Sequence, residues 1–193
     1  MADDTHLIET PLQSEPLLRG SFLHAQRDTV RLPTGDTATR EYVVHPGAVM
    51  VVPILDDGRL VMERQYRWPL QQVLLEFPAG KMDPGEDALT CAARELAEET
   101  GYRAAEWARA CVMHNAAAYS TEAIEVWFAR GLSLGERDLD HGEHIDVLPM
   151  AAEELEALAA RGELTDAKTL IGLLWLSRWR AGAWPLQWQP VAA

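Results

Sequence analysis

Four charged side chains stand close together in one short segment of this 193-residue chain: Arg94, Glu95, Glu98 and Glu99. A helix turns by about 100° per residue, so the three glutamates would fall within one sector of about 100°. The apolar and small residues of the same segment gather in a different sector, which we expect to face the core: Leu89, Ala92, Ala93, Leu96 and Thr100. The spacing therefore predicts a helix over 86–100 that carries three carboxylates on one exposed ridge.

Carboxylates one helical turn apart repel each other, so a cation is expected to compensate for them. Arg94 can neutralise one acid. The remaining carboxylates suit hard divalent cations, which prefer oxygen ligands, and magnesium or manganese is the simplest choice. The alternative for any acidic helix face is that water alone solvates it.

The spacing of the whole segment 80–102 distinguishes these alternatives. Seven residues stand at the fixed positions of the Nudix box: Gly80, Glu86, Arg94, Glu95, Glu98, Glu99 and Gly101. With each residue type used at roughly 6%, seven such identities coincide in about one window per 10⁸. The segment therefore resembles the Nudix hydrolase family. This resemblance implies an α/β fold, specifically an α/β/α sandwich with a mixed sheet, and it implies that the box forms a loop, a helix and a second loop.

The resemblance also implies roles for the residues of the box. It implies these ligands of a divalent metal: the main-chain carbonyl of Ala79, and the side chains of Glu95, Glu98 and Glu99. Arg94 is implied to brace the loop through Glu86. A bound cation would neutralise a phosphoanhydride and acidify a water for attack, which makes magnesium, with manganese as a substitute, the expected cofactor.

The proton of the attacking water needs an acceptor, and the residues leave its identity open. Glu98 is one candidate. Glu143, in the polar loop between Gly135 and His144, is the favoured loop carboxylate because related enzymes bring a glutamate of this loop to the metal. Asp140 and Asp146 are its rivals.

Further segments extend the resemblance over about residues 40–175. Residues 40–48, 63–67, 75–81 and 162–169 are similar to the ADP-ribose and nucleoside diphosphate sugar pyrophosphatase branch of the family. This branch implies a magnesium-dependent enzyme that cleaves nucleoside diphosphate sugars, with ADP-ribose cut to AMP and ribose 5-phosphate as the leading expectation.

Four residues outside the box are candidate substrate contacts. Arg67 can donate a planar fork to a phosphate, and Arg40 can stack on the base or meet a phosphate. Glu76 is a candidate for a ribose or a metal-bound water, and Glu122 for a ribose. The structural alternatives are an ion pair for Arg67, a solvated edge for Arg40 and pairing with Lys81 for Glu76.

One departure from the branch widens the choice of function. The branch commonly has a Ser-Pro-Gly turn after the box, whereas this chain has residues 114–122 without proline or glycine. The alternatives are therefore a GDP-mannose or dinucleotide polyphosphate hydrolase, in which Tyr119 stacks a base, and a binding module without turnover. The intact acidic helix argues against the binding module.

The elements that must position these residues follow from hydrophobic periodicity and turn signals. We expect residues 1–40 to form an N-terminal tail and strand segment used in dimerisation, and residues 41–193 to form the Nudix domain. Strands are predicted at 42–44 and 49–55 within the run 41–55, and at 59–62, 73–77, 124–128 and 145–148, with an Asp57-Gly58 hairpin turn. Helices are predicted at 86–100, at 151–161, and from Thr165 or Asp166 through Trp179.

Composition excludes several classes of protein. The formal net charge of −13 would repel phosphate backbones, so nucleic acid is not an expected partner. Two cysteines, Cys91 and Cys111, are too few for a disulfide scaffold and favour the reducing cytoplasm. No signal peptide and no membrane helix are expected. The expected partners are a small nucleotide-sugar substrate and a second copy of the chain, in a homodimer.

Overall fold

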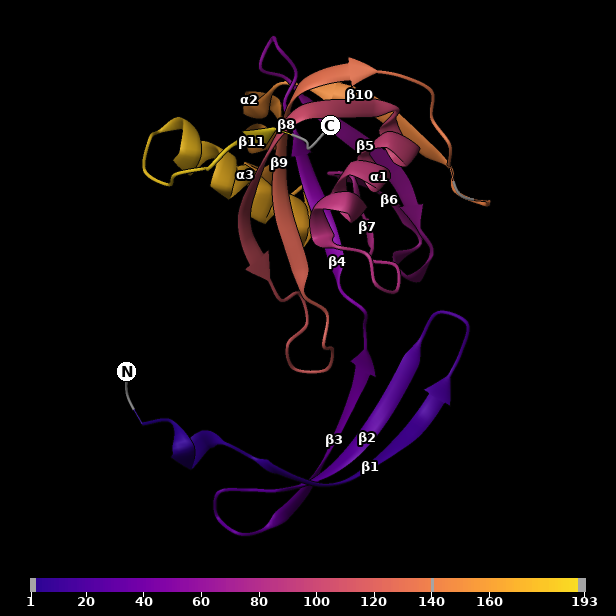
Figure 1. The fold of residues 1–193 in the computed structure, drawn as a ribbon, viewed down its shortest axis with the longest axis vertical. Coiled ribbons are helices and arrows are strands. Elements are labelled where there is room, and N and C mark those ends of the chain that lie inside the picture. Colours follow the sequence, from indigo (N-terminus) through magenta and orange to yellow (C-terminus); the bar gives the residue numbers. More distant parts are fainter. Residues whose placement is uncertain (1–2, 140, 191–193) are drawn as a thin grey trace. The chain divides into compact units, whose positions relative to one another are not determined.

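The computed structural model describes residues 3–139 and 141–190, which form two compact units. The N-terminal unit contains residues 3–46 and 116–123, and the larger unit contains residues 47–115 and 124–190. Each unit has its own sheet structure (Figure 1). No helix within these described ranges is long and apolar enough to cross a bilayer.

The N-terminal unit is a three-stranded antiparallel meander. Its elements are a short 3₁₀ turn η1 (Thr5–Leu7) and the strands β1 (Thr10–Arg19), β2 (His24–Arg31) and β3 (Thr37–Val44). β1 pairs with β2 of the same chain, and all ten of its residues are exposed. The loop 116–123 belongs to this unit because Val43 exchanges backbone hydrogen bonds with Tyr119 and Thr121, at 2.9 and 3.0 Å.

The larger unit contains two sheets and three helices. Its strands are β4 (Ala48–Pro53), β5 (Leu60–Arg67), β6 (Gln72–Glu76), β7 (Ala79–Lys81), β8 (Tyr102–Met113), β9 (Ile124–Leu134), β10 (Ile145–Met150) and β11 (Gln189–Pro190). Its helices are α1 (Ala88–Thr100), α2 (Ala152–Ala160) and α3 (Ala167–Arg180), with a 3₁₀ turn η2 (Trp68–Leu70). The five-stranded sheet has the order β11-β8-β9-β4-β7, and the three-stranded sheet has the order β10-β5-β6. β4 and β9 are parallel and the other pairs are antiparallel, so the predicted mixed sheet is confirmed.

Alternation along β4 explains the layers of the larger unit. Val49 and Val51 belong to the core that α1 covers, whereas Met50 and Val52 belong to the core that α2 and α3 cover. Side chains of a strand point to opposite faces in turn, so one apolar strand supplies both cores. Figure 1 shows α1 on the opposite side of the sheet from α2 and α3, which is the expected α/β/α sandwich.

Most predicted elements of the larger unit are confirmed. The Asp57-Gly58 turn closes with a Leu55–Arg59 hydrogen bond of 2.9 Å, and Gly58 has a φ of +85°. Asp166, rather than Thr165, caps α3. β8 was not predicted, because its alanine-rich sequence has little strand propensity and is held in the sheet by pairing with β9.

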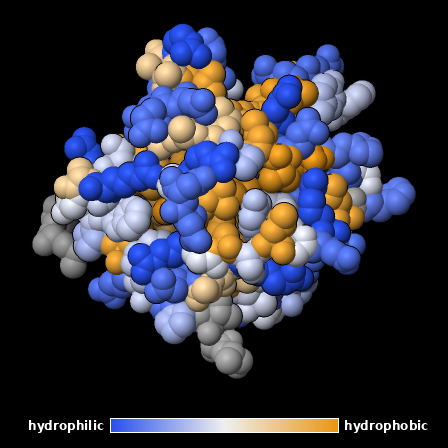
Figure 2. All heavy atoms as spheres, turned by 90° about the horizontal axis from the view of Figure 1, so that it is seen from above, coloured by the Kyte–Doolittle hydropathy of each residue, from blue (hydrophilic) through white to orange (hydrophobic). Residues whose placement is uncertain are grey.

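The tryptophan-rich C-terminal segment packs onto the larger unit. Trp179 lies 6.2 Å from Phe128 and 5.7 Å from Trp188, measured between ring centroids, and Trp175 lies 4.5 Å from Trp184. Trp179 therefore packs α3 against β9, and both tryptophans of α3 also contact the segment that follows the helix. Seen from above, the molecule shows hydrophilic side chains around hydrophobic ones (Figure 2).

Candidate active site

Helix α1 is held in place at both ends by local signals. The Asp87 carboxylate accepts hydrogen bonds from the Leu89 and Thr90 backbone N–H groups, both at 3.1 Å, and so caps the first turn. Gly101 ends the helix in the left-handed conformation with a φ of +79°. Cys91 and Leu96 are fully buried in the core. The helix is therefore fixed in rotation, and its glutamates are directed towards β7 and the loop after it.

A single guanidinium contacts three carboxylates on this side of α1. Arg94 donates a fork to Glu86, with both bonds at 2.9 Å, and a third nitrogen contacts Glu95 at 2.8 Å and Glu98 at 3.0 Å. Hydrogen bonds from Arg94 lower the pKa of Glu86 to about 2. One positive charge serves three acids, so the cluster keeps an excess of negative charge. The contact expected between Arg94 and Glu86 is present.

β7 brings backbone directly against the acidic helix. The Ala79 N–H donates to Glu99 Oε2 at 3.0 Å. A Cβ atom placed on Gly80 would lie 1.9–2.3 Å from the carboxylate atoms of Glu95, so any side chain there would displace that carboxylate. Glu95 and Glu99 therefore both lie against the Ala79-Gly80 segment, where the sequence placed the metal ligands.

The predicted exposed ridge is wrong for Glu99, which is 4% exposed. Burial, together with the charges of Glu63 and Glu95, raises the pKa of Glu99 to about 10. Burial also raises the pKa of Glu95. These carboxylates are shielded from water because β7 packs against this side of the helix. Helical periodicity alone cannot predict this contact, since β7 is a separate segment of the chain.

Sequence reasoning missed Glu63, which shares this buried environment. It is 3% exposed, and its Oε1 atom has no hydrogen-bond partner within residues 3–139 and 141–190. Burial and the neighbouring charge of Glu76 raise the pKa of Glu63 to about 8. The available signal was an acid directly after the apolar residues 60–62 of a strand, where an unpaired buried carboxylate is costly.

This donor set fits a divalent cation. Among the described residues, no group of three His, Cys, Asp or Glu side chains is arranged to hold a metal ion by itself. Magnesium, however, is usually held by one or two carboxylates, with water and substrate phosphates completing its shell. The buried oxygens of Glu63 and Glu99 and the close approach of Glu95 to Gly80 provide such oxygen ligands in one place.

A second charged cluster joins β5, β6 and α3. Arg67 donates a fork to Glu76, with both bonds at 2.8 Å, and Lys168 contacts the same carboxylate. Burial would raise the pKa of Glu76, but the hydrogen bonds from Arg67 and the charge of Lys168 outweigh it and lower this pKa. The suggested pairing of Glu76 with Lys81 is therefore replaced by pairing with Arg67 and Lys168.

Two predicted substrate contacts lie in the N-terminal unit. Arg40 donates to Glu9 through Nε at 3.0 Å and through Nη2, and to the Thr39 carbonyl at 3.0 Å. Glu122 lies 3.6 Å from His45 Nε2. Both side chains thus have partners within their own unit.

The loop carboxylates differ in where the structure places them. The charge of Glu143 contributes to raising the pKa of both Glu95 and Glu99, so Glu143 lies near the acidic helix. Asp140 lies outside the described residues. Asp146 pairs with Arg64 across β10 and β5, whereas Glu63 pairs with Val147, so Asp146 and Glu63 point to opposite faces of the sheet.

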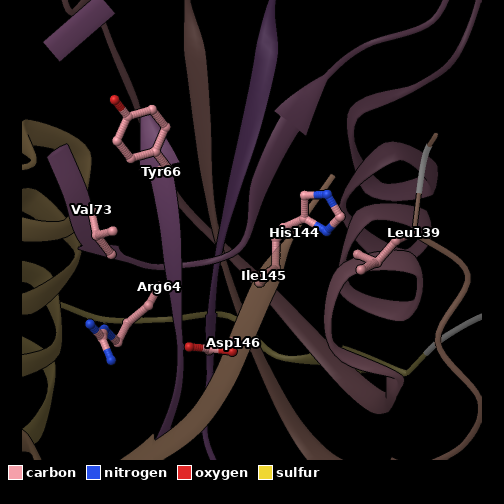
Figure 3. Close-up of a pocket in the computed structure, with 7 residues that line it drawn as sticks. All are labelled: Arg64, Tyr66, Val73, Leu139, His144, Ile145 and Asp146. Carbon is pink, nitrogen blue, oxygen red and sulfur yellow. The ribbon is translucent and has the colours of Figure 1, made fainter. Parts of the chain in front are cut away.

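Asp146 instead lines a pocket of about 380 Å³. The other lining residues, drawn in Figure 3, are Arg64, Tyr66, Val73, Leu139, His144 and Ile145. This position argues against Asp146 as the acceptor of a proton at the acidic helix and leaves Glu143 and Glu98 as the candidates among the described residues.

Known proteins resemble this chain over most of its length. The NUDIX domain family matches residues 44–171, and the nucleoside diphosphate sugar hydrolase N-terminal domain matches residues 9–43. The ADP-ribose pyrophosphatase of Bacillus subtilis (strain 168) is 35% identical over 172 residues, which cover 88% of this chain and 93% of that protein.

Two further proteins are similar to this chain over nearly the same share of its length. The methanol dehydrogenase activator of Bacillus methanolicus is 36% identical over 170 residues, which cover 87% of this chain and 92% of that protein. The crystal structure of an ADP compounds hydrolase superimposes with a TM-score of 0.81 at 25% identity, over 90% of this chain and 95% of that one. The similarity therefore includes both the N-terminal unit and the larger unit.

Proposed function

This chain belongs to the Nudix family, and we propose that it is a divalent-metal-dependent pyrophosphohydrolase that cleaves ADP-ribose to AMP and ribose 5-phosphate. The match of residues 9–43 to the N-terminal domain of nucleoside diphosphate sugar hydrolases supports this class of substrate. The name of the Bacillus subtilis relative supports ADP-ribose within the class.

The observation that carries the proposal is the placement of Glu95 and Glu99 against the Ala79-Gly80 segment. In this proposal the metal, magnesium or manganese, is held by the Ala79 carbonyl together with Glu95, Glu98 and Glu99. When bound, the metal neutralises the diphosphate and acidifies the attacking water. Glu143 accepts the proton of that water, with Glu98 as the alternative.

The remaining residues bind the substrate or hold the site together. Arg67 meets the diphosphate. Arg40 and Glu122 stay candidates for contacts with the base and a ribose. Arg94 keeps the box loop on α1 through its fork to Glu86, which also limits the freedom of Glu95.

The test is product analysis with the purified full-length chain. With magnesium and ADP-ribose we expect equimolar AMP and ribose 5-phosphate, and we expect EDTA to abolish both products and added magnesium to restore them. Intact ADP-ribose after prolonged incubation with magnesium or manganese would refute the proposed activity.

We also propose that the chain is a homodimer of the reducing cytoplasm. Leu12, Leu17 and Leu18 on β1 are 43–51% exposed, and an edge strand that exposes apolar side chains is usually covered. Both cysteines are free, as in reduced proteins. Light scattering should give about twice the chain mass of 21.5 kDa, and a value of one chain mass at micromolar concentration would refute the dimer.

A further inference from the structure

Lys168 is a buried lysine at the start of α3, and it is only 8% exposed. Lysine is almost never buried without a partner. Its Nζ atom contacts Asp166 at 3.0 Å and also contacts Glu76 Oε2. This lysine therefore joins α3 to the end of β6, next to the candidate active site.

The carboxylate of Glu76 accepts three hydrogen bonds from its two cationic neighbours. Oε1 accepts from Arg67 Nε, and Oε2 accepts from Arg67 Nη2 and from Lys168 Nζ. The side chain of Glu76 is 3% exposed, so neither oxygen is open to a ribose. Glu76 is thus better suited to hold another side chain than to bind substrate.

The same hydrogen bonds determine which nitrogen of Arg67 can still contact an anion. Both nitrogens of the fork face Glu76, which leaves Nη1 as the nitrogen directed away from it. The Arg67 side chain is 38% exposed, so it reaches the surface while its fork stays on a buried carboxylate. A guanidinium held in this way can present Nη1 to an anion with little further loss of conformational freedom.

The anchor of Lys168 is rigid as well. Asp166 caps α3 by accepting from the Thr169 N–H at 2.9 Å and from its hydroxyl at 2.6 Å. The Thr169 hydroxyl in turn accepts from the N–H of Phe77 at 3.0 Å, the residue after Glu76. The first turn of α3 is therefore tied to the end of β6 by two independent contacts, through Lys168 and through Thr169.

We propose that Lys168 is a positioning residue, which holds Glu76 and through it fixes the Arg67 guanidinium so that Nη1 meets the diphosphate of the substrate. The proposal rests on the function proposed above, because it assigns Arg67 to that diphosphate. Lys168 itself touches no substrate. Without it, Glu76 loses one of three donors and can turn, and Arg67 turns with it.

The experiment compares steady-state kinetics of Lys168→Met and the wild type with ADP-ribose and magnesium. We expect KM to rise about tenfold while kcat changes less than about threefold, since the lost orientation weakens binding of substrate and transition state alike. Calorimetry of ADP-ribose binding without metal should show a similar loss of affinity.

Arg130→Met is the matched control, because it removes a guanidinium that forks onto Glu106 elsewhere in the larger unit. Its KM should stay within about twofold of the wild-type value.

A double-mutant cycle tests whether Lys168 acts through Glu76. In a Glu76→Gln background, Lys168→Met should raise KM by less than about twofold, because the group it positions is already altered. A tenfold rise in that background, or a KM for Lys168→Met no higher than that for Arg130→Met, would overturn the proposal.

If Lys168→Met does not fold, Lys168→Gln replaces it. The shorter, uncharged amide of this variant should also raise KM, and an unchanged KM would again overturn the proposal. Absence of turnover in the wild type would instead refute the proposed function.

Discussion

The Glu99 carboxylate is buried among other acids, which is seldom seen without a cation bonded to the carboxylate. It is buried, and neighbouring cations are bonded to other acids: Arg67 and Lys168 to Glu76, and Arg94 to Glu86, Glu95 and Glu98. Within the described ranges 3–139 and 141–190, its backbone donor is the N–H of Ala79. A carboxylate in this position is unfavourable in its charged form unless a further cation joins it. The divalent metal of the proposed reaction would meet that need.

Conservative changes at the proposed ligands test this account. Glu99→Gln and Glu95→Gln should each lower kcat for ADP-ribose by about 10²-fold, because each removes a charged ligand without changing side-chain volume. The wild-type Tm should rise with magnesium, and this rise should be smaller in both variants, because only binding to the folded state stabilises it. Glu156→Gln, on exposed α2 surface, serves as the control. Near-wild-type turnover of both variants at limiting magnesium would contradict the metal assignment.

The fork between Arg94 and Glu86 should contribute to stability in a pH-dependent way. Because the pKa of Glu86 falls from 4.5 to about 2 on folding, its contribution is complete above the unfolded pKa of 4.5 and is lost as the pH falls towards 2. Glu86→Gln should therefore lower the free energy of unfolding at pH 7 by about 1–2 kcal/mol. The difference from wild type should shrink between pH 4.5 and 2.

Urea denaturation across this pH range measures the effect. Glu163→Gln is the matched control, because Arg161 forks onto Glu163 with the same geometry on the exposed surface, where little stability is expected from the pair. A Glu86→Gln difference that stayed constant from pH 7 to pH 3 would contradict the linkage.

At the scale of elements, the sequence predicted those whose signals are local. Asp87, Gly101 and the apolar face of α1 act within the helix, so its position could be predicted to within two residues. Asp57-Gly58 and Asp166 act in the same way for the hairpin turn and for α3.

Contacts between distant segments could not be predicted in this way. β8 has few strand formers and exists because it pairs with β9 over most of its length. Glu63 and Lys168 are buried by segments far from them in the chain, and the partners of Glu76 come from β5 and from α3. The sequence therefore predicted the acidic helix but not the buried charges that surround it.

Strand β7 offers a test at this scale. Gly80→Ala should reduce kcat for ADP-ribose by more than about tenfold, because a Cβ atom at 1.9–2.3 Å from the Glu95 carboxylate must displace it. Gly85→Ala is the control within the same box: it meets no atom within 4 Å, and only its φ of +82° is strained. Gly85→Ala should thus lower Tm yet keep most of the turnover. Equal activities of the two variants at a temperature where both are folded would contradict the placement of Glu95.

At the scale of the whole molecule, we expect net charge and loop composition to affect which substrate is preferred. The chain carries a net charge of −13, so a diphosphate is attracted only where arginines or a bound metal reverse the local field. Residues 116–123 belong to the N-terminal unit and lack the proline and glycine of the usual turn. We therefore expect ADP-ribose to be the preferred substrate and GDP-mannose to be cleaved more slowly.

The most direct measurement of the central claim is kcat/KM with magnesium for ADP-ribose, GDP-mannose, a diadenosine polyphosphate and dGTP. This ratio reports the relative stabilisation of each transition state by the free enzyme. The account predicts the highest value for ADP-ribose, a lower but measurable value for GDP-mannose, and the lowest values for the diadenosine compound and dGTP. A value for dGTP or the diadenosine compound about tenfold above that for ADP-ribose would contradict the assignment to nucleoside diphosphate sugars.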